Sequence, residues 1–293
     1  MLWFILALSS AVLSAAAAVT QKKVLFRLDA LDFSVRLAQL TLLLSLPLFF
    51  LIDLHALPVA AIAVLFGKTL LGALAFLCVM QAIKTHELSA ALPLMVLTPG
   101  LVALTAFVAL GEALSLLEIG GMALLLAGTY LLEMRAGAPL LRPFTVFFTS
   151  RTHMPIVAAL LLFTATAVLD RYLLTDLRLR PLPMLAFQNL FLALHLTVIA
   201  LVMKRPAQPW RERGRVAYPA LILLVAVCTL GYRFAQIEAV ALAPVALVLA
   251  VKRVSVLLAA MFGGSLFRER DLGRKAVAIV LLLTGAACIL HWW

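Results

Sequence analysis

The sequence predicts an all-α integral membrane protein of ten transmembrane helices, built as two inverted repeats of five helices each. Hydrophobic residues make up 65% of its 293 residues and charged residues 13%, whereas typical soluble domains have roughly 45–50% and about 25%. The sequence LLLAG at 124–128 returns as LLLTG at 281–285, and the same spacing relates Glu112 to Glu269. Such a repeat in so apolar a chain indicates a duplicated membrane bundle, because lipid solvates the outer faces of the helices.

Ten apolar runs approach the length of about 20 residues that a helix needs to cross the hydrocarbon. They lie at 2–19, 33–52, 58–83, 88–110, 115–133, 154–175, 182–203, 217–240, 243–266 and 276–292. Most connections between them are short, so we expect successive helices to be antiparallel. A longer connection with Gly, Pro and Arg joins the two halves. We therefore predict a first five-helix repeat at 1–134, a linker at 135–153 and a second five-helix repeat at 154–293.

The first apolar run has the small residues of a signal-peptide cleavage site at 15–17, but no Lys or Arg precedes it. The missing basic residue argues against a signal peptide. Residues 18–22 (AVTQK) also align with 167–171 (AVLDR) at a slightly shorter spacing, so the first helix has a counterpart in the sixth. Because five is odd, the two repeats must have opposite orientations, and a site is expected where they meet.

The net charge of +11 comes mostly from alternate connections between the apolar runs. Sixteen cations follow helices one, three, five, seven and nine, whereas Arg178 and Arg180 lie on the other side. The positive-inside rule then places both termini outside the cytoplasm, in a multi-pass protein of a bacterial inner (plasma) membrane. The chain has no basic tail and no interleaving of aromatic with basic residues, which argues against a nucleic-acid partner.

A succession of short motifs marks the first half. They are Ala82-Ile83-Lys84, Ala90-Ala91-Leu92-Pro93, Leu97-Thr98-Pro99, Leu110-Gly111-Glu112-Ala113-Leu114-Ser115 and Ile119-Gly120. This succession resembles the EamA family of the drug/metabolite transporter superfamily. The second half departs from this pattern, because Val256 stands where Pro99 would be. It resembles one subgroup of the family instead, in having Lys252-Arg253 with Ser255, followed by Glu269. The resemblance implies a ten-helix transporter, in a superfamily that includes exporters of amino acids and other metabolites, drug pumps and sugar-phosphate exchangers.

Polar residues within the apolar runs are the candidates for substrate binding. They are Lys252, Arg253, Lys68, Arg233, Asp170, Gln188, Asn189, Gln236 and Arg36. A cation in mid-membrane costs roughly 2.5–3.5 kcal/mol, so one that cannot reach the interface is a site candidate. Lys252 and Arg253 are adjacent and differ in direction by about 100° on a helix, so at most one points straight at a central cavity. Together such cations would bind a carboxylate or phosphate. Alternatively, ion pairs with acidic residues neutralise them.

Two further groups have alternative roles. Asp170 could carry protons or bind a substrate amine, but we favour an ion pair with Arg171 or Arg178. Gln188, Asn189 and Gln236 could orient a ligand or link helices, and linking is the commoner role, at about 0.6 kcal/mol per bond. His195 is expected to pack or to form a hydrogen bond.

Other residues are expected to shape the helices. Glu112 and Glu269 each stand before a helix, where a carboxylate can cap free backbone N–H groups. We favour this capping role over the alternative, a role in transport. Pro93 and Pro99 are predicted to kink the fourth helix. Glycines at 121 and 128, on one helix face, allow close contact with another helix. Cys78, Cys228 and Cys288 lie within apolar runs, without disulfide or metal spacing, and are expected to pack.

No catalytic or nucleotide-binding motif is visible, so we expect neither an enzyme nor a cofactor, nor a bound metal. The sequence favours a secondary active transporter, most simply an exporter, of a small metabolite with an anionic group such as an amino acid or organic acid. Alternating access would be driven by protons or a counter-substrate. The alternative is a translocator of lipids or lipid-linked sugars on the same scaffold. We expect a monomer or a homodimer, with the lipid bilayer and the small-molecule substrate as partners.

Overall fold

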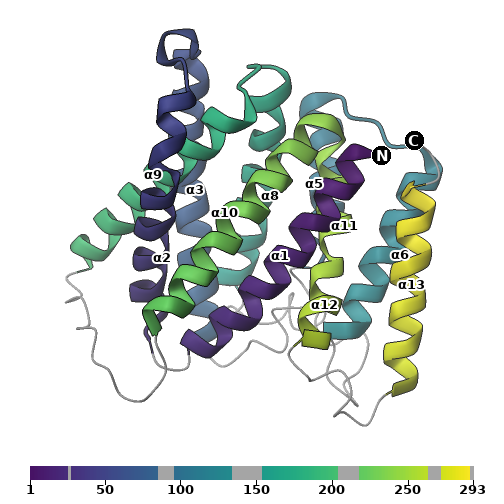
Figure 1. Cartoon of the computed structure of the whole chain (residues 1–293). Helices are drawn as coiled ribbons and strands as arrows, with labels where there is room; N and C mark the ends of the chain where they lie inside the picture. The colour runs from purple at the N-terminus through teal and green to yellow at the C-terminus, as the bar shows by residue number, and fades with distance from the viewer. Residues whose placement is uncertain (26–27, 85–95, 134–153, 204–217, 263–271, 291–293) are drawn as a thin grey trace.

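The chain forms an all-helical bundle in a computed structural model that describes residues 1–25, 28–84, 96–133, 154–203, 218–262 and 272–290 (Figure 1). In chain order the helices are α1 (Leu2–Leu25), α2 (Ala30–Ser45), η1 (Leu46–Leu51), η2 (Leu54–Ala56), α3 (Val59–Lys84), α5 (Thr98–Leu110), α6 (Leu116–Glu133), α8 (Met154–Thr175), α9 (Pro181–Val202), α10 (Tyr218–Leu242), α11 (Val245–Lys252), α12 (Val254–Phe262) and α13 (Leu272–Leu290). The described residues contain no strand. The start of α1 and the end of α13 lie on the same side of the bundle (Figure 1).

Six of the described helical segments are long and apolar enough to cross a bilayer. They are Leu2–Leu25, Leu31–Leu51, Val59–Cys78, Val157–Thr175, Pro181–Val202 and Pro219–Leu242. Three shorter apolar helices are Thr98–Leu110, Leu116–Leu132 and Ala276–Ile289. Large apolar side chains such as Phe50, Val59 and Val108 are exposed on the outside of the bundle. The protein is therefore a multi-pass integral membrane protein, because lipid can solvate these side chains.

The helix pairs in contact correspond between the two halves. In Figure 1, α1 lies along α10 and α6 along α13, and α3 packs on α8 while α2 packs on α9. The helices of the two halves can be matched in chain order: α1 with α8, α2 with α9, α3 with α10, α5 with α12, and α6 with α13. The contact between α1 and α10 then corresponds to the contact between α8 and α3. The contact between α1 and α12 likewise corresponds to that between α8 and α5, and all four contacts are observed. Each helix therefore packs mainly on a partner from the other half.

Closely spaced glycines bring α6 and α13 together. A Cβ atom at Gly128 would lie 2.8 Å from the Ala278 carbonyl oxygen, and one at Gly285 would lie 2.6 Å from the Gly121 carbonyl oxygen. Gly128 and Gly285 end the two repeated pentapeptides, and the same spacing relates Gly121 to Ala278. The two contacts are thus reciprocal, as in an interface with two-fold symmetry. The predicted close contact at Gly121 and Gly128 is confirmed.

The turn between α5 and α6 corrects the predicted role of Glu112. Gly111 ends α5 with a φ of 68°, a left-handed conformation that glycine adopts without a steric penalty. At the start of α6, the Ser115 N–H donates to Glu118 Oε2 at 2.7 Å, and the Glu118 N–H donates to Ser115 Oγ at 3.2 Å. This reciprocal pair is a capping box. Glu118 therefore caps α6, and Glu112 does not; Glu269 lies outside the described residues.

The predicted ninth span, 243–266, is not one continuous helix. It divides into α11 and α12 at Arg253, where the Arg253 N–H donates to the Ala250 carbonyl and the Val256 N–H to the Arg253 carbonyl, at 3.0 and 2.9 Å. Hydrogen bonds to the third residue back, rather than the fourth, are typical of a 3₁₀ turn and interrupt the α-helix. At the repeat spacing Arg253 corresponds to Val96, which lies in a turn just before α5 begins. α12, which starts at Val254, and α5, which starts at Thr98, therefore begin at nearly corresponding positions.

The kink predicted at Pro99 stays a prediction, because residues 85–95 lie outside the described residues. Pro99 lies in the first turn of α5, which starts at Thr98. Proline is tolerated there because the N–H groups of a first helical turn have no partner within the helix. Pro93 lies outside the described residues. The second span also differs from its prediction, because it ends as the 3₁₀ segment η1, with Pro47 in its first turn.

Substituting the contact glycines should destabilise the bundle. Gly128→Ala and Gly285→Ala each place a methyl group against a backbone carbonyl, and we expect a loss of about 1–3 kcal/mol, as for other overpacked sites. Thermal unfolding of the purified protein in detergent measures the effect.

Gly120→Ala is the matched control, because a Cβ atom there meets nothing within 4 Å. It should raise stability slightly or leave it unchanged, since alanine favours a helix over glycine. Equal melting temperatures for all three variants would contradict the close α6–α13 contact.

Candidate functional site

A cavity of about 440 Å³ lies at the centre of the bundle and is lined by α1, α2, α3 and α8 to α11. Its polar lining residues are Gln21, Ser34, Thr41, Lys68, Thr69, Thr166, Asp170, Gln188, Asn189, Thr229, Tyr232, Arg233, Gln236 and Lys252. A second cavity of about 270 Å³ shares Thr166, Asp170, Gln236 and Lys252 with the first. The volume of the central cavity falls within the usual range for small-molecule sites, about 300–1,000 Å³.

An ion pair between Lys68 and Asp170 joins the two halves of the chain at this cavity. Lys68 comes from α3 and Asp170 from α8, and the Lys68 ammonium also donates to Gln188 Oε1 of α9 at 2.5 Å. The Lys68 side chain is 7% exposed and that of Asp170 15% exposed. The expected pairing of Asp170 with Arg171 or Arg178 is therefore wrong. Consecutive helical residues point about 100° apart, so Arg171 leaves the cavity while Asp170 enters it.

Lys252, at the end of α11, lies over neutral groups of α10. Its ammonium donates to Gln236 Oε1 and stands 4.5 Å from the centre of the Tyr232 ring. Tyr232 and Gln236 are four residues apart, so both lie on one face of α10. Lys252 lines both cavities, whereas Arg253 lines the second. The break between α11 and α12 at Arg253 is what allows both cations to border the cavity system.

Arg233 and Asn189 are two more candidates that the bundle brings to the central cavity. Within the described ranges, no hydrogen bond or ion pair reaches the Arg233 guanidinium. Asn189 is 2% exposed, and its side-chain Nδ2 has no hydrogen-bond partner among the described residues. Both side chains therefore keep hydrogen-bond donors that a ligand could use.

Two of the polar residues singled out in the sequence lie elsewhere. Arg36, on α2, lines neither cavity. His195 is bonded to the Thr69 hydroxyl through Nδ1 at 3.3 Å, and its ring lies 4.6 Å from that of Phe66. The expected packing and hydrogen-bonding role of His195 is confirmed.

Hydroxyl and aromatic residues of the cavity lining escaped the sequence analysis. Thr229 and Tyr232 lie on the same helix as Arg233 and Gln236, and Ser34 and Thr41 are seven residues apart on α2. A spacing of three, four or seven residues places side chains on one face of a helix. This spacing could have identified these residues from the sequence. Without it, single Ser and Thr residues are too common in membrane helices to be chosen as site candidates.

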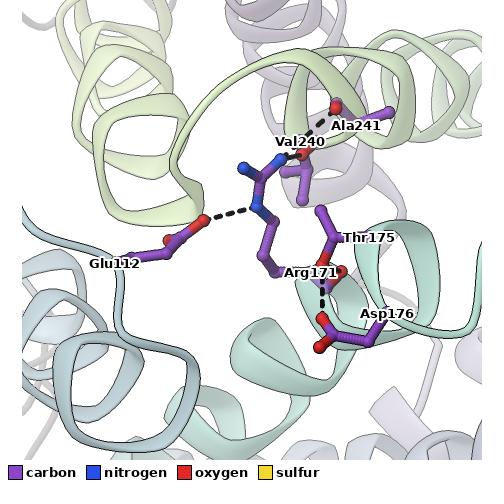
Figure 2. Close-up of polar contacts among 6 residues, drawn as sticks. All are labelled: Glu112, Arg171, Thr175, Asp176, Val240 and Ala241. Carbon is purple, nitrogen blue, oxygen red and sulfur yellow. Dashed lines mark hydrogen bonds and ion pairs between the residues drawn. The ribbon is translucent and has the colours of Figure 1, made fainter.

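A second polar cluster lies beside the cavity, on the side where α8 and α10 end (Figure 2). The Arg171 guanidinium pairs with Glu112 through Nε, and through Nη1 it donates to the Val240 and Ala241 carbonyls at 2.5 and 3.3 Å. Carbonyls in the last turn of a helix lack helical partners and attract cations. We call Arg171, Glu112 and these two carbonyls the latch. It connects the α5–α6 turn of the first half to α8 and α10 of the second.

Comparison with known proteins identifies the family. The profile of the EamA-like transporter family matches residues 1–134 and 151–291. The chain belongs to the EamA-like transporter family. One crystal structure aligns with 99% of this chain and 97% of its own, with a TM-score of 0.74 at 16% sequence identity, which supports the fold alone. No curated protein matches the chain. Membership makes this a membrane transporter of the drug/metabolite transporter superfamily, a group not typically enzymes.

The Lys68–Asp170 pair of this EamA-like protein should be essential for stability as a pair. Asp170→Asn leaves a buried ammonium without its counter-charge, so we expect a loss of about 3–5 kcal/mol. Replacing both residues, with Lys68→Met and Asp170→Leu, should recover most of that loss. Unfolding in detergent, analysed as a double-mutant cycle, measures the coupling.

Asp176→Asn is the control, since Asp176 is exposed and its carboxylate accepts a hydrogen bond from the neighbouring Thr175 hydroxyl. It should change stability by less than about 0.5 kcal/mol. If Asp170→Asn proves as mild as this control, the ion pair does not stabilise the bundle.

Proposed function

We propose that this EamA-like protein is a secondary active transporter of a small metabolite with an anionic group, and that it works by alternating access. The observation that carries the proposal is the central cavity, where Lys68, Arg233 and Lys252 accompany one carboxylate, Asp170. A low-dielectric cavity with an excess of positive charge favours anions. The sequence has no nucleotide-binding motif, so an ion gradient or a counter-substrate would drive transport.

The architecture proposed for this mechanism is two inverted five-helix repeats, with the repeats at 1–134 and 154–293. The reciprocal contacts of Gly128 and Gly285 across α6 and α13 support it, as do the matched helix pairs. In transporters built from inverted repeats, the substrate site lies where the repeats meet. The central cavity has this position, because α3 and α2 of the first half line it together with α8, α9 and α10 of the second.

The proposed direction of transport is export. The cavity lining reaches Gln21 near the end of α1 and Phe33 near the start of α2. Lys22 and Lys23 lie in the last turns of α1, and Arg27 stands between α1 and α2 in the sequence. By the positive-inside rule this side faces the cytoplasm, and both termini lie outside, in a bacterial inner membrane. A cavity that extends toward the cytoplasmic side could load substrate from there. We propose that the latch closes the opposite side.

Removing the cavity cations should abolish transport. Arg233→Gln and Lys252→Gln each remove a charged hydrogen-bond donor, and we expect each variant to lose a factor of about ten or more in transport rate. Uptake of radiolabelled glutamate, succinate and glycerol 3-phosphate into proteoliposomes measures the effect.

Arg180→Gln, in the exposed α8–α9 connection, is the matched control and should transport at the normal rate. Normal transport by both cavity variants would exclude the proposed site. If none of the solutes moves but a fluorescent anionic phospholipid crosses between the leaflets, the protein is a lipid translocator instead.

Opening of the latch should expose the cavity to the side that carries the termini. Glu112→Gln weakens the ion pair with Arg171. The reporter is Ile237→Cys in a protein whose Cys78, Cys228 and Cys288 are replaced by Ala, and an impermeant maleimide is added outside intact cells. We expect Glu112→Gln to raise the labelling rate of this cysteine at least about fivefold. Ile237 lines the cavity one turn before Val240. Asp53→Asn, an exposed carboxylate in the α2–α3 connection, should leave the rate unchanged. Equal labelling with both variants would contradict a gating role for the latch.

A further inference from the structure

The charges in the central cavity do not balance. Lys68, Arg233 and Lys252 line it together with a single carboxylate, that of Asp170. Asp170 is paired with Lys68, whose ammonium also donates to Gln188. This pair accounts for one positive charge and for the one negative charge among the described residues that line this cavity.

The other two cations have no hydrogen bond or ion pair with a carboxylate among the described residues. The Lys252 ammonium has the Gln236 Oε1 atom and the face of the Tyr232 ring as its neighbours. The Arg233 guanidinium has no hydrogen bond or ion pair in the part of the chain that the structure describes. Electrostatic repulsion from Arg233 reaches both Lys68 and Lys252, and attraction from Asp170 reaches both as well. One carboxylate is therefore shared among three cations.

The two cations also converge on one turn of α10. Tyr232 and Gln236, which contact Lys252, flank Arg233 in the sequence of that helix. On a helical wheel Arg233 is about 60° from Gln236, so it lies on a neighbouring strip of the same helix. A ligand bound between Arg233 and Lys252 would therefore need two negative charges that lie close together in its own structure.

We infer that the substrate is a small dianion whose two negative charges face Arg233 and Lys252. A ligand that fills the cavity displaces the water that solvates these cations, and at low dielectric each unmatched charge is then unfavourable. Two negative charges restore the balance, and one does not. A phosphate monoester or a short dicarboxylate has this chemistry. The inference rests on the proposed function, which requires only an anionic group.

Matched pairs of ligands test the charge number. Methyl phosphate and succinate are dianions at pH 8, and dimethyl phosphate and monomethyl succinate are monoanions of similar shape. Thermal stabilisation of the purified full chain gives an apparent affinity for each, because a ligand of the folded state raises its stability. We expect at least one dianion to bind about tenfold or more tightly than its monoanionic partner.

Variants assign the preference to the cavity. Arg233→Gln should remove the difference between the two members of the pair, Arg233→Lys should retain it, and Arg180→Gln should behave as the unmodified protein. Equal affinity for a dianion and its monoanion in the unmodified protein overturns the inference, while leaving the proposed function intact if Lys252→Gln still weakens both. If none of the four compounds binds, the inference is also wrong. Transport of monoanions by the same preparation would then show that the proposed function survives.

Discussion

The absence of water from the bilayer interior is the constraint on which the rest of this structure depends. Polar groups there must be satisfied within the protein, so helices form throughout the described chain and charged side chains turn inward. Lys68 and Asp170 meet across two helices from different halves. Arg171 finds Glu112 and two carbonyls at the end of α10. Each contact satisfies a charge and also ties the halves together at a defined place.

The duplicated scaffold and the cavity chemistry follow different rules. Close packing repeats in both halves, since Gly128 and Gly285 make reciprocal contacts between α6 and α13. The charged residues of the cavity lining do not repeat. At the same spacing Lys68 corresponds to Val225, and Arg233 corresponds to Phe76. Small residues are needed wherever two backbones approach, so packing preserves the symmetry. A ligand without symmetry needs its charged partners once, so the cavity lining can diverge.

Asp170 and Arg171 show how one short segment can serve two sites. Asp170 lines the cavity and pairs with Lys68, while Arg171 belongs to the latch and pairs with Glu112. Because the two residues are adjacent on a rigid helix, a rotation of α8 that loosens one pair also moves the other. The ion pair at the cavity and the latch therefore share one rigid element, α8.

The sequence by itself determined the membrane class, the internal repeat and the charged residues that reach the cavity, and its short motifs resembled the family. Class, repeat and charges follow from composition, from periodicity and from the high cost of a mid-membrane charge, all of which are local properties. Only the tertiary structure decided the partners. Asp170 pairs with Lys68 rather than with its neighbour, Glu118 rather than Glu112 caps α6, and α11 ends beside Arg253. The reason is geometric: pairing depends on which helix faces lie opposite each other, and spacing along one helix carries no information about the face of another.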